Sequence, residues 1–466
     1  MTPPQAPPHQ RPYASVLDTI GWTPLIRLSR MGAGLRTPIY GKAEYANPGG
    51  SVKDRIGLAI IEDAEARGVL KPGGTIVEGT SGNTGVGLAI AAAIRGYHCI
   101  FTMPDKMSQE KVRLLKAYGA EVVITPTAVP PDHPDHYVMK AKQIVRDTPG
   151  AVLADQFYNQ VNPDVHYRTT GPELWEQTDG RITHFVAGAG TGGTVSGAGK
   201  YLKERNPAIH VIAGDPVGSL YTQYHRTRTQ GEGHPYKVEG IGGDKIPSTI
   251  WFDWVDEFRQ VPDRTSLTLA RRLAREEGIL AGGSTGLNLA IALEVARETD
   301  DPDAVIVTLL CDTGERYLSK QFNDEWMQEN QMLEAPRVTV EQLLERRPQG
   351  SPPLVSVAPA AAVRQALNLM STWGVSQIPV LDDGTSVGGL TEGGLMTRAL
   401  AQPSLLDRPV REVMESPFPE IDASMPSDRV ASTLNRETPA ALVRKDGKLV
   451  GIVSRYDVLQ QMIGTR

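Results

Sequence analysis

The chain has little of several residue types, and each shortage excludes a class of protein. Only two cysteines, Cys99 and Cys311, occur in 466 residues, and both lie in or beside apolar runs typical of strands. We therefore expect buried, unreactive thiols rather than a disulfide or a cysteine nucleophile. Lys and Arg number 48 against 54 Asp and Glu, without a basic tract, which argues against a nucleic-acid partner. No apolar run is long enough to cross a bilayer, so no membrane partner is predicted.

The first twelve residues lack the apolar segment of a signal peptide. Residues 1–12 are polar and rich in proline, which predicts a disordered tail on a cytoplasmic protein. His133 and His136 lie in a Pro-Asp-His-Pro-Asp-His run that would suit a metal ion. Because no third or fourth ligand stands at a recognisable spacing, we expect a polar surface loop and no metal.

Short apolar runs alternate with amphipathic stretches through the first two thirds of the chain. The expected strands are 75–78, 99–103, 121–125, 152–154, 185–187, 211–213 and 305–310, and two of the expected helices are 84–95 and 108–118. This alternation, with short Gly/Pro turns, predicts an α/β fold with mainly parallel sheets and helices on both faces. Ligands of such sheets bind at the carboxyl ends of the strands, where the glycine-rich loops of this chain fall.

The composition changes near residue 328, and an internal repeat follows. Residues 331–353 are polar and contain prolines, as linkers do. Residues 375–391 are then echoed by 438–454, each reading as strand, Asp-Gly turn, strand and helix. The predicted organisation is a tail at 1–12, a large domain at 13–330, a linker at 331–353 and a tandem pair at 354–466.

One lysine stands at the first turn of a predicted helix. Lys53 follows a glycine-rich loop, Ser51 is the expected N-cap, and Asp54 is its expected capping-box partner. Ile56, Ala59, Ile60 and Ala64 continue at helical spacing. The helix dipole and partial burial would lower the pKa of the ammonium, which suits a Schiff-base amine. Taken alone, an ordinary solvated lysine remains the commoner interpretation.

Three further loops bear on that choice. Residues 78–85 carry hydroxyls and backbone N–H groups at a helix start, which predicts a cradle for a carboxylate, although a plain capping loop has the same pattern. Residues 188–194 combine glycines with Thr191 and Thr194, which predicts a phosphate cradle. Residues 281–286 precede another helix and are also compatible with a simple connection.

A phosphate cradle, a carboxylate cradle and a Schiff-base lysine together indicate a pyridoxal phosphate enzyme that acts on an amino acid. From about Gly21 to Met327 the chain resembles the β-family (fold type II) pyridoxal phosphate enzymes, and within them the cystathionine β-synthases. The resemblance implies Lys53 as the catalytic Schiff-base lysine. It further implies cofactor contacts from Asn83, Gly190, Thr191, Gly192, Gly193, Thr194 and Ser284, and substrate contacts from Thr80, Ser81, Thr84 and Gln156.

The Ser284 hydroxyl would face the pyridine nitrogen. A neutral hydroxyl there does not favour a protonated ring, which suits β-elimination and β-replacement. The resemblance thus implies a lyase of transsulfuration and cysteine biosynthesis that joins serine or O-acetylserine to homocysteine, giving cystathionine. Two alternatives stay open: a cysteine synthase using O-acetylserine and sulfide, and a non-catalytic adenylate-sensing scaffold.

The segments that discriminate these family members point in both directions. A proline-rich insertion at 125–134 and the segments 103–107, 162–167 and 320–327 resemble cystathionine synthases. Residues 314–317, Gly-Glu-Arg-Tyr, resemble cysteine synthase. Gly243 stands where animal and yeast cystathionine synthases carry tyrosine, which removes a hydroxyl from the second-substrate pocket. No cysteine precedes Cys99, so the haem ligands of animal enzymes are missing and no haem is predicted.

The C-terminal repeat resembles a tandem pair of CBS domains, regulatory modules that often bind adenosyl ligands. Residues 451–457 match the ribose-contacting pattern, with Ser454 and Asp457 as the expected contacts. The first copy, at 389–394, lacks the aspartate, so one nucleoside site is expected rather than two. The resemblance implies S-adenosylmethionine or an adenine nucleotide as ligand, and a homodimer. The alternative is a purely structural, dimer-forming module.

Overall fold

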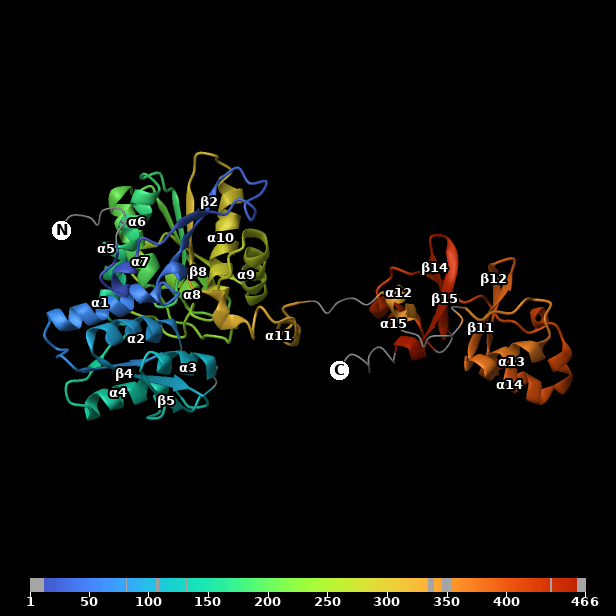
Figure 1. The fold of residues 1–466 in the computed structure, drawn as a ribbon. Helices are drawn as coiled ribbons and strands as arrows, with labels where there is room; N and C mark the ends of the chain where they lie inside the picture. Colours follow the sequence, from blue (N-terminus) through green and yellow to red (C-terminus); the bar gives the residue numbers. More distant parts are fainter. Residues whose placement is uncertain are drawn as a thin grey trace. The chain divides into compact units, whose positions relative to one another are not determined.

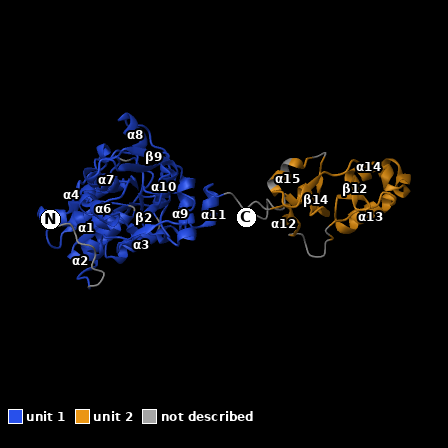
Figure 2. Ribbon diagram, turned by 90° about the horizontal axis from the view of Figure 1, so that it is seen from above, with its two compact units in different colours: residues 1–333 blue, residues 334–466 orange. Residues whose placement is uncertain are grey.

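The protein is described by a computed structural model that falls into two compact units, residues 1–333 and 334–466 (Figure 2). The described residues are 12–80, 82–105, 107, 109–130, 132–333, 339–345, 352, 354–435 and 438–458. The predicted tail, apart from residue 12, lies outside them, and so does much of the predicted linker. Within that linker Val340–Glu345 forms helix α12, because Val340 and Leu343 are buried in the core of the second unit.

The first unit contains a six-stranded and a four-stranded sheet (Figure 1). The larger sheet has the order β1-β2-β10-β7-β8-β9 and is parallel except for the β1–β2 pair. Its strands are β1 (Leu25–Arg27), β2 (Ile39–Ala43), β7 (His184–Gly188), β8 (His210–Pro216), β9 (Glu257–Val261) and β10 (Ile306–Leu310). The smaller, wholly parallel sheet has the order β5-β4-β3-β6, formed by β3 (Thr75–Gly79), β4 (His98–Pro104), β5 (Glu121–Thr125) and β6 (Val152–Leu153).

Helices cover both faces of the larger sheet, as the alternation of its strands requires. Val186 and Ile212 face a core shared with α9 and α10, whereas Phe185 and Val211 face one shared with α6 and α7. The helices of this unit are α1 (Lys53–Ala66), α2 (Asn83–Arg95), α3 (Gln109–Ala117), α4 (Tyr137–Asp147), α5 (Val161–Arg168), α6 (Thr170–Gln177), α7 (Gly193–Arg205), α8 (Tyr221–Thr227), α9 (Asp263–Glu277), α10 (Gly283–Thr299) and α11 (Asp324–Glu329).

The predicted α/β class is confirmed, and each expected strand forms with ends shifted by at most a few residues. The smaller sheet packs Phe101 and Met103 against α1, α2 and α3, with α4 against its other face. Strands β1, β2 and β9 were not predicted. No helix within the described residues is both long and apolar enough to cross a membrane.

The second unit holds the two predicted hairpins. Strands β11 (Gln377–Asp382) and β12 (Thr385–Thr391) pair antiparallel, as do β14 (Ala440–Lys445) and β15 (Lys448–Ser454). Each Asp-Gly turn has two positive φ angles, 44° and 76° at Asp383 and Gly384 and 48° and 77° at Asp446 and Gly447. Such angles belong to type I′ turns, which explains why Asp-Gly marks both hairpins.

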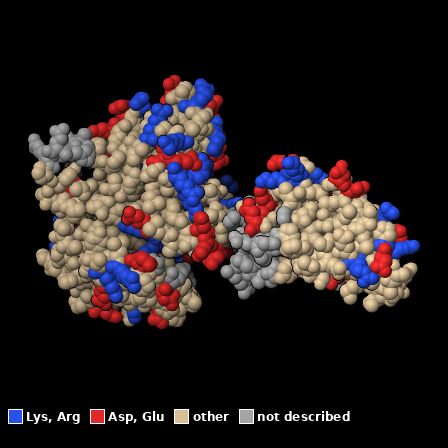
Figure 3. Space-filling model, turned by 45° about the vertical axis from the view of Figure 1, so that its right-hand side comes forward, with Lys and Arg blue, Asp and Glu red and all other residues tan. Residues whose placement is uncertain are grey.

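The remaining elements of the second unit are strand β13 (Glu420–Asp422) and helices α13 (Val363–Trp373), α14 (Glu392–Ala401) and α15 (Ser427–Thr433). Strand β13 joins β14 and β15 in a three-stranded sheet. Phe418 is buried between the copies, since its ring packs with Leu442 of one hairpin and lies against Gly389 of the other. In Figure 3 the visible face of this unit is broad and largely uncharged, whereas charges of both signs are interspersed on the first unit.

Candidate active site

The predicted site residues lie where parallel strands of the first unit end. Thr80 follows β3 and Gln156 follows its neighbour β6, while Thr191 and Asp312 follow the neighbours β7 and β10. Hydrogen bonds join the two sheets at this edge, because the Asn83 amide of α2 donates to Asp312 at 2.7 Å. The carboxyl ends of the strands thus form one site, as expected for open α/β sheets.

Lys53 occupies the first position of α1, and its side chain is partly buried. Among the described residues its Nζ has no hydrogen-bond or ion-pair partner. Burial lowers the pKa of the ammonium, and the nearby Cys311 and Asp312 oppose that shift. A lysine with a lowered pKa and an unengaged amine is suited to covalent chemistry.

The predicted capping of α1 is corrected in two respects. Val52, not Ser51, is the N-cap, although the Ser51 hydroxyl still accepts from the Lys53 N–H at 3.2 Å. The Asp54 carboxylate accepts from Gly49 N at 2.5 Å instead of returning to Ser51, because the loop folds back over the helix start. Burial raises the pKa of Asp54 to about 7.

Sequence reasoning missed a buried ion-pair network beside Lys53. The Arg55 guanidinium contacts Glu44 of the segment after β2 and Glu173 of α6 at 2.7 to 2.8 Å, and Lys42 of β2 reaches Glu173 at 2.6 Å. All four side chains are at most 2% exposed. Buried charges need such complete pairing. The network therefore fixes α1, and with it Lys53, against β2 and α6.

The predicted carboxylate cradle is assembled from the ends of β3 and β6. The Thr84 hydroxyl donates to Gln156 Oε1 at 2.6 Å, and Thr80 lies buried one turn before it. Ser81, also predicted here, lies outside the described residues. Glu78 accepts from the backbone N–H groups of Asp155 and Gln156 at 2.8 and 3.3 Å, which fixes the turn that carries Gln156. Burial raises the pKa of Glu78 to about 7.

Asn83 is the first residue of α2, and its side-chain amide is hydrogen-bonded at both Nδ2 and Oδ1. Its Nδ2 donates to Asp312, and its Oδ1 accepts from Arg316, whose guanidinium also donates to the carbonyl of Gly49. Arg316 belongs to the segment that resembles cysteine synthase. It therefore lies between the loop before Lys53 and the start of α2, within the predicted site.

The predicted phosphate loop connects β7 to α7. Gly192 is the N-cap of α7 with φ 77°, and a Cβ built on it would lie 2.1 Å from Ile250 Cγ1. A Cβ on Gly193 would lie 1.9 Å from Asn162 Oδ1. Only glycine fits both positions. Helix α7 thus begins with open N–H groups beside Thr191 and Thr194, the arrangement that binds anions.

Two side chains of α5 contact this loop, and sequence reasoning did not assign them to it. Asn162 Nδ2 lies 2.8 Å from Thr191 Oγ1, and His166 Nε2 lies 3.2 Å from Thr194 Oγ1. Both side chains are 1% exposed. Their spacing of four residues places them on one face of α5, a signal that the sequence does contain.

Ser284 lies in the first turn of α10, 8% exposed, beside Cys311. Burial raises the pKa of the Cys311 thiol to about 11, and a hydrogen bond from Ser284 opposes that shift. Burial likewise raises the pKa of Cys99 to about 12. Both cysteines are free thiols, Cys99 buried and Cys311 partly buried, and a raised pKa favours the protonated thiol in each.

Gly243 lies against a tyrosine from another element. A Cβ at position 243 would lie 2.1 Å from the hydroxyl oxygen of Tyr221, which donates to the carbonyl of Gly190 at 2.8 Å. Tyr221 is fully buried in α8. The space beside the phosphate loop that a side chain at 243 would enter is thus filled by the Tyr221 hydroxyl.

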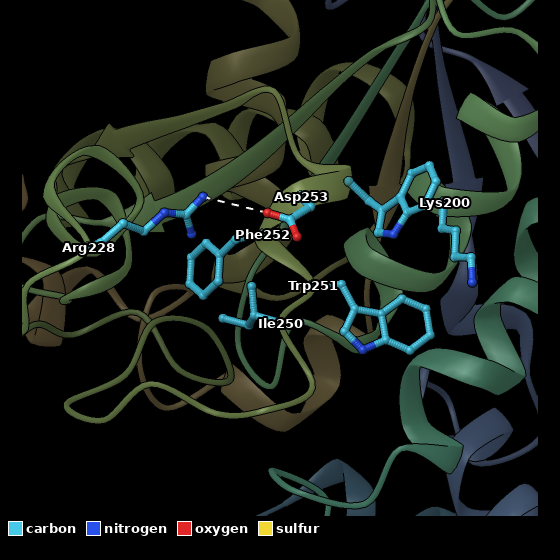
Figure 4. A pocket seen from close by; sticks show the side chains of 7 residues that line it. Lys200, Arg228, Ile250, Trp251, Phe252 and Asp253 are labelled. Atoms are coloured by element: carbon cyan, nitrogen blue, oxygen red, sulfur yellow. Dashed lines mark ion pairs between the residues drawn. The ribbon is translucent and has the colours of Figure 1, made fainter.

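A surface pocket of about 500 Å³ lies beside helix α7, which carries Lys200 (Figure 4). It is lined by Lys200, Arg228 and residues 250–254. Lys200 Nζ lies over the rings of Tyr167, Trp251 and Trp254 at 5.2, 5.3 and 5.7 Å, while Arg228 and Asp253 pair at 3.9 Å. None of the predicted cofactor or substrate residues lines this pocket, so it is not the predicted reaction site.

Ser454 and Asp457, the predicted nucleoside contacts of the second unit, are hydrogen-bonded to each other. The carboxylate of Asp457, the expected ribose contact, accepts from the N–H and the hydroxyl of Ser454, each at 2.7 Å. Thr391, at the equivalent place of the first copy, accepts from Gly394 N at 3.3 Å. Both arrangements cap the helix that follows the hairpin. Among the described residues no group of three or more His, Cys, Asp or Glu is placed to hold a metal ion.

Comparison with known proteins identifies the families that this chain matches. Residues 16–312 match the family model for pyridoxal-phosphate dependent enzymes, and residues 350–400 and 410–464 match that for the CBS domain. A cystathionine beta-synthase from Dictyostelium discoideum is 37% identical over 462 residues, covering 96% of this chain and 92% of the relative. One from Saccharomyces cerevisiae is 38% identical over 419 residues, 83% of this chain and 81% of the relative.

A solved structure resembles the first unit as well. The crystal structure of an O-ureido-L-serine synthase superposes with a TM-score of 0.62 and 38% sequence identity, covering 68% of this chain and all of that one. The two chains therefore share a fold over this length, while the second unit has its counterpart in the CBS-domain model.

Proposed function

The chain belongs to the pyridoxal-phosphate dependent enzymes, and within them to the cystathionine beta-synthase family with C-terminal CBS domains, and from this premise we propose the residues and substrates of its reaction. The predicted family, fold class and pyridoxal phosphate cofactor are thereby confirmed. We propose that Lys53 holds the cofactor covalently through Nζ. We further propose that the enzyme joins serine or O-acetylserine to homocysteine, giving cystathionine.

The residues of the site fit this cofactor. The start of α7, with Gly192, Gly193 and two threonine hydroxyls, suits the phosphate. Ser284 bonds to Cys311 and Asn83 donates to Asp312, and Cys311 and Asp312 are both near enough to act on the charge of Lys53. Both side chains therefore suit contacts to the ring. Bound pyridoxal phosphate supplies the electron sink that lets a proton leave Cα and a substituent leave Cβ of an amino acid.

Lys53 carries the proton transfers in this proposal. Its Nζ accepts the Cα proton of the first substrate and returns a proton to the departing β-hydroxyl oxygen. Burial lowers the pKa of the ammonium, which increases the share of neutral amine available for that work near neutral pH. The network of Arg55 with Glu44 and Glu173 keeps the first turn of α1, and therefore Nζ, in place.

The substrate carboxylate is bound by the α2 start in this proposal. Thr80 and Thr84 flank that start, and Gln156 faces Thr84 across it. Ser81, which lies outside the described residues, is assigned to the same group from the sequence alone. The helix dipole favours an anion at this point. A carboxylate held there fixes one end of the substrate, which orients its Cα for proton transfer to Lys53.

The observation that carries the proposal is the unengaged, partly buried Lys53 Nζ at the meeting point of the loops. Borohydride reduction of the cofactor-bound protein, followed by peptide mass mapping, tests it. The expected adduct lies on residue 53, and an adduct elsewhere would overturn the assignment. Assays that combine serine or O-acetylserine with homocysteine or sulfide then identify the substrates.

Two observations favour a second candidate, a cysteine synthase that uses O-acetylserine and sulfide. Arg316, from the segment that resembles that enzyme, lies inside the site between Asn83 and Gly49. Position 243 also offers no side chain to a second amino acid. Faster turnover with sulfide than with homocysteine would favour this candidate.

For the second unit we propose an adenosyl ligand, S-adenosylmethionine or an adenine nucleotide, bound near Ser454 and Asp457. The CBS-domain match supports this proposal. Isothermal calorimetry with both compounds tests it, with Asp457→Asn as the comparison variant, and the absence of binding heat from either compound contradicts it. We also propose a cytoplasmic homodimer, to be tested by cell fractionation and analytical ultracentrifugation; its free thiols suit a reducing compartment.

A further inference from the structure

Helix α5 lies between the helix that carries Lys53 and the helix that follows the phosphate loop. It packs on α1 through Val165, which is buried with Ile56 and Ala59. It approaches α7 so closely that a Cβ on Gly197 would lie 1.9 Å from the carbonyl oxygen of Pro163. This close approach allows short polar side chains of α5 to reach the loop directly.

Asn162 is the first of these side chains. Its Nδ2 donates to the carbonyl of Gln156 and to Thr191 Oγ1, both at 2.8 Å, so both amide hydrogens are used. Since a hydroxyl oxygen that accepts one hydrogen bond still holds its own hydrogen, Thr191 keeps that hydrogen for another acceptor. The contact therefore makes Thr191 a donor toward the interior of the loop.

His166 contacts a hydroxyl at each ring nitrogen. Thr170 Oγ1 lies 2.8 Å from Nδ1, and Thr194 Oγ1 lies 3.2 Å from Nε2. Thr170 is fully buried, and among the described residues its hydroxyl contacts only this ring. Its hydrogen must therefore point at Nδ1, because a buried hydroxyl hydrogen without an acceptor is costly.

That donation selects the tautomer of His166. With Nδ1 accepting, the proton of the neutral ring sits on Nε2 and is donated to Thr194 Oγ1. Thr194, like Thr191, then keeps its own hydrogen. The opposite tautomer would leave the Thr170 hydrogen without an acceptor and would turn the Thr194 hydrogen away from the loop, toward His166.

We propose that α5 presets both hydroxyls of the phosphate loop as donors, with Asn162 and His166 as positioning residues that give the loop its preference for a phosphate over a neutral group. This inference rests on the assignment of residues 190–194 to the cofactor phosphate. Burial, together with the charges of Arg55 and Lys53 and against that of Glu44, lowers the pKa of His166 to about 3, so the ring stays neutral at physiological pH.

The test compares pyridoxal phosphate with pyridoxal, which lacks the phosphate, in titrations of the full-length protein freed of cofactor. In His166→Asn the amide can replace Nδ1 but not the Nε2 donor, so pyridoxal phosphate should bind about tenfold to a hundredfold more weakly, the range for a hydrogen bond to a charged group. Pyridoxal should bind as in the wild type. In His166→Gln the amide reaches the Nε2 position and should restore most of the affinity.

His184→Asn is the matched control, because His184 begins β7, at the end of the strand away from the loop. It should leave both affinities unchanged. A His166→Asn variant that loses affinity for both compounds equally would overturn the proposal, since a merely structural role predicts that result. In a protein that already carries Thr194→Val, adding His166→Asn should weaken pyridoxal phosphate binding no further. If the losses of affinity from the two substitutions add in full in the double variant, the proposal is also overturned.

Nitrogen-15 NMR of the histidine rings gives a readout that needs no cofactor. The His166 signals, assigned by their loss in His166→Gln, should show the proton on Nε2, and a proton on Nδ1 contradicts the proposal. The outcome is separable from that of the Lys53 assignment. Borohydride labelling away from residue 53 would overturn the lysine assignment alone, whereas loss of the phosphate-specific effect would overturn the α5 proposal alone.

Discussion

The two proposed anion loops differ in how their hydroxyls are engaged. In the phosphate loop, Thr191 and Thr194 receive contacts from the neutral side chains of α5 and keep their hydrogens. In the carboxylate loop the Thr84 hydroxyl already donates to Gln156, beside Glu78 with its raised pKa. A permanently bound cofactor suits the first arrangement, which needs no change when the ligand binds. A substrate that enters and leaves suits the second, which exchanges a protein contact for a ligand contact.

The strongest test of this division is Lys53→Ala. We expect turnover to fall by at least about a thousandfold, because the amine supplies general acid–base catalysis as well as covalent attachment. Pyridoxal phosphate should still bind, since the phosphate loop does not involve Lys53. Dialysis should then remove the cofactor from the variant but not from the wild type. Turnover within tenfold of wild type would contradict the division of roles.

The second test concerns the network that fixes Lys53. Arg55→Leu leaves Glu44 buried without its cation and leaves Glu173 with Lys42 alone, which should lower the free energy of unfolding by about 3 to 5 kcal/mol. Arg95→Leu is the matched control, because Arg95 also contacts two glutamates but is 37% exposed. It should cost about 0 to 1 kcal/mol. Urea unfolding measures both, and equal losses would show that the buried network does not hold α1.

The third test uses pH, since the carboxylate loop, unlike the phosphate loop, contains a group with a pKa near neutrality. The pKa of Glu78 is raised from 4.5 to about 7 in the folded protein, so the folded state binds more protons than the unfolded state between these values. Stability from this group is therefore complete below about pH 4.5 and is lost by about 3 kcal/mol at most as the pH rises to about 7.

Glu78→Gln should remove this loss of unfolding free energy at rising pH. The difference in unfolding free energy between the wild type and the variant should change across this pH window and be constant above it. The matched histidine variant His166→Gln should show a change of the opposite sign. The pKa of His166 is lowered from 6.5 to about 3 in the folded protein, so the ring gains a proton only on unfolding, and wild-type stability falls as the pH drops through this window. A flat difference for Glu78→Gln would mean that its carboxyl is ionised throughout.

The comparison of the two loops also shows which features of the structure can be predicted from the sequence. The loops could be predicted because glycines and hydroxyls sit next to each other in the chain, and the hairpins because Asp-Gly turns are local. Strand β9 was missed because its Glu-Phe-Arg-Gln-Val sequence is short and polar, as suits the edge of a sheet. In contrast, the residues that fix the loops in place have no glycine or turn pattern by which the sequence would identify them.

Those holding residues come from distant parts of the chain. Arg55 meets Glu173 across 118 positions, and Asn162 meets Thr191 across 29. Periodicity places Asn162 and His166 on one face of a helix, but only the packing of α5 on α7 shows what that face meets. Charge pairs and tautomers are therefore decided by tertiary contacts, and a single sequence carries no local signal for them.

The smallest expected effect probes the phosphate loop from its other side. Gly243→Ala places a Cβ 2.1 Å from the Tyr221 hydroxyl, so the tyrosine must move and its hydrogen bond to the Gly190 carbonyl is lost. One neutral hydrogen bond of about 0.5 to 1.5 kcal/mol should weaken pyridoxal phosphate binding by about three- to tenfold. Gly233→Ala, whose Cβ meets nothing closer than 3.6 Å, is the control and should bind normally. If Gly243→Ala binds as tightly as the control, Tyr221 does not support the loop, and α5 alone accounts for its rigidity.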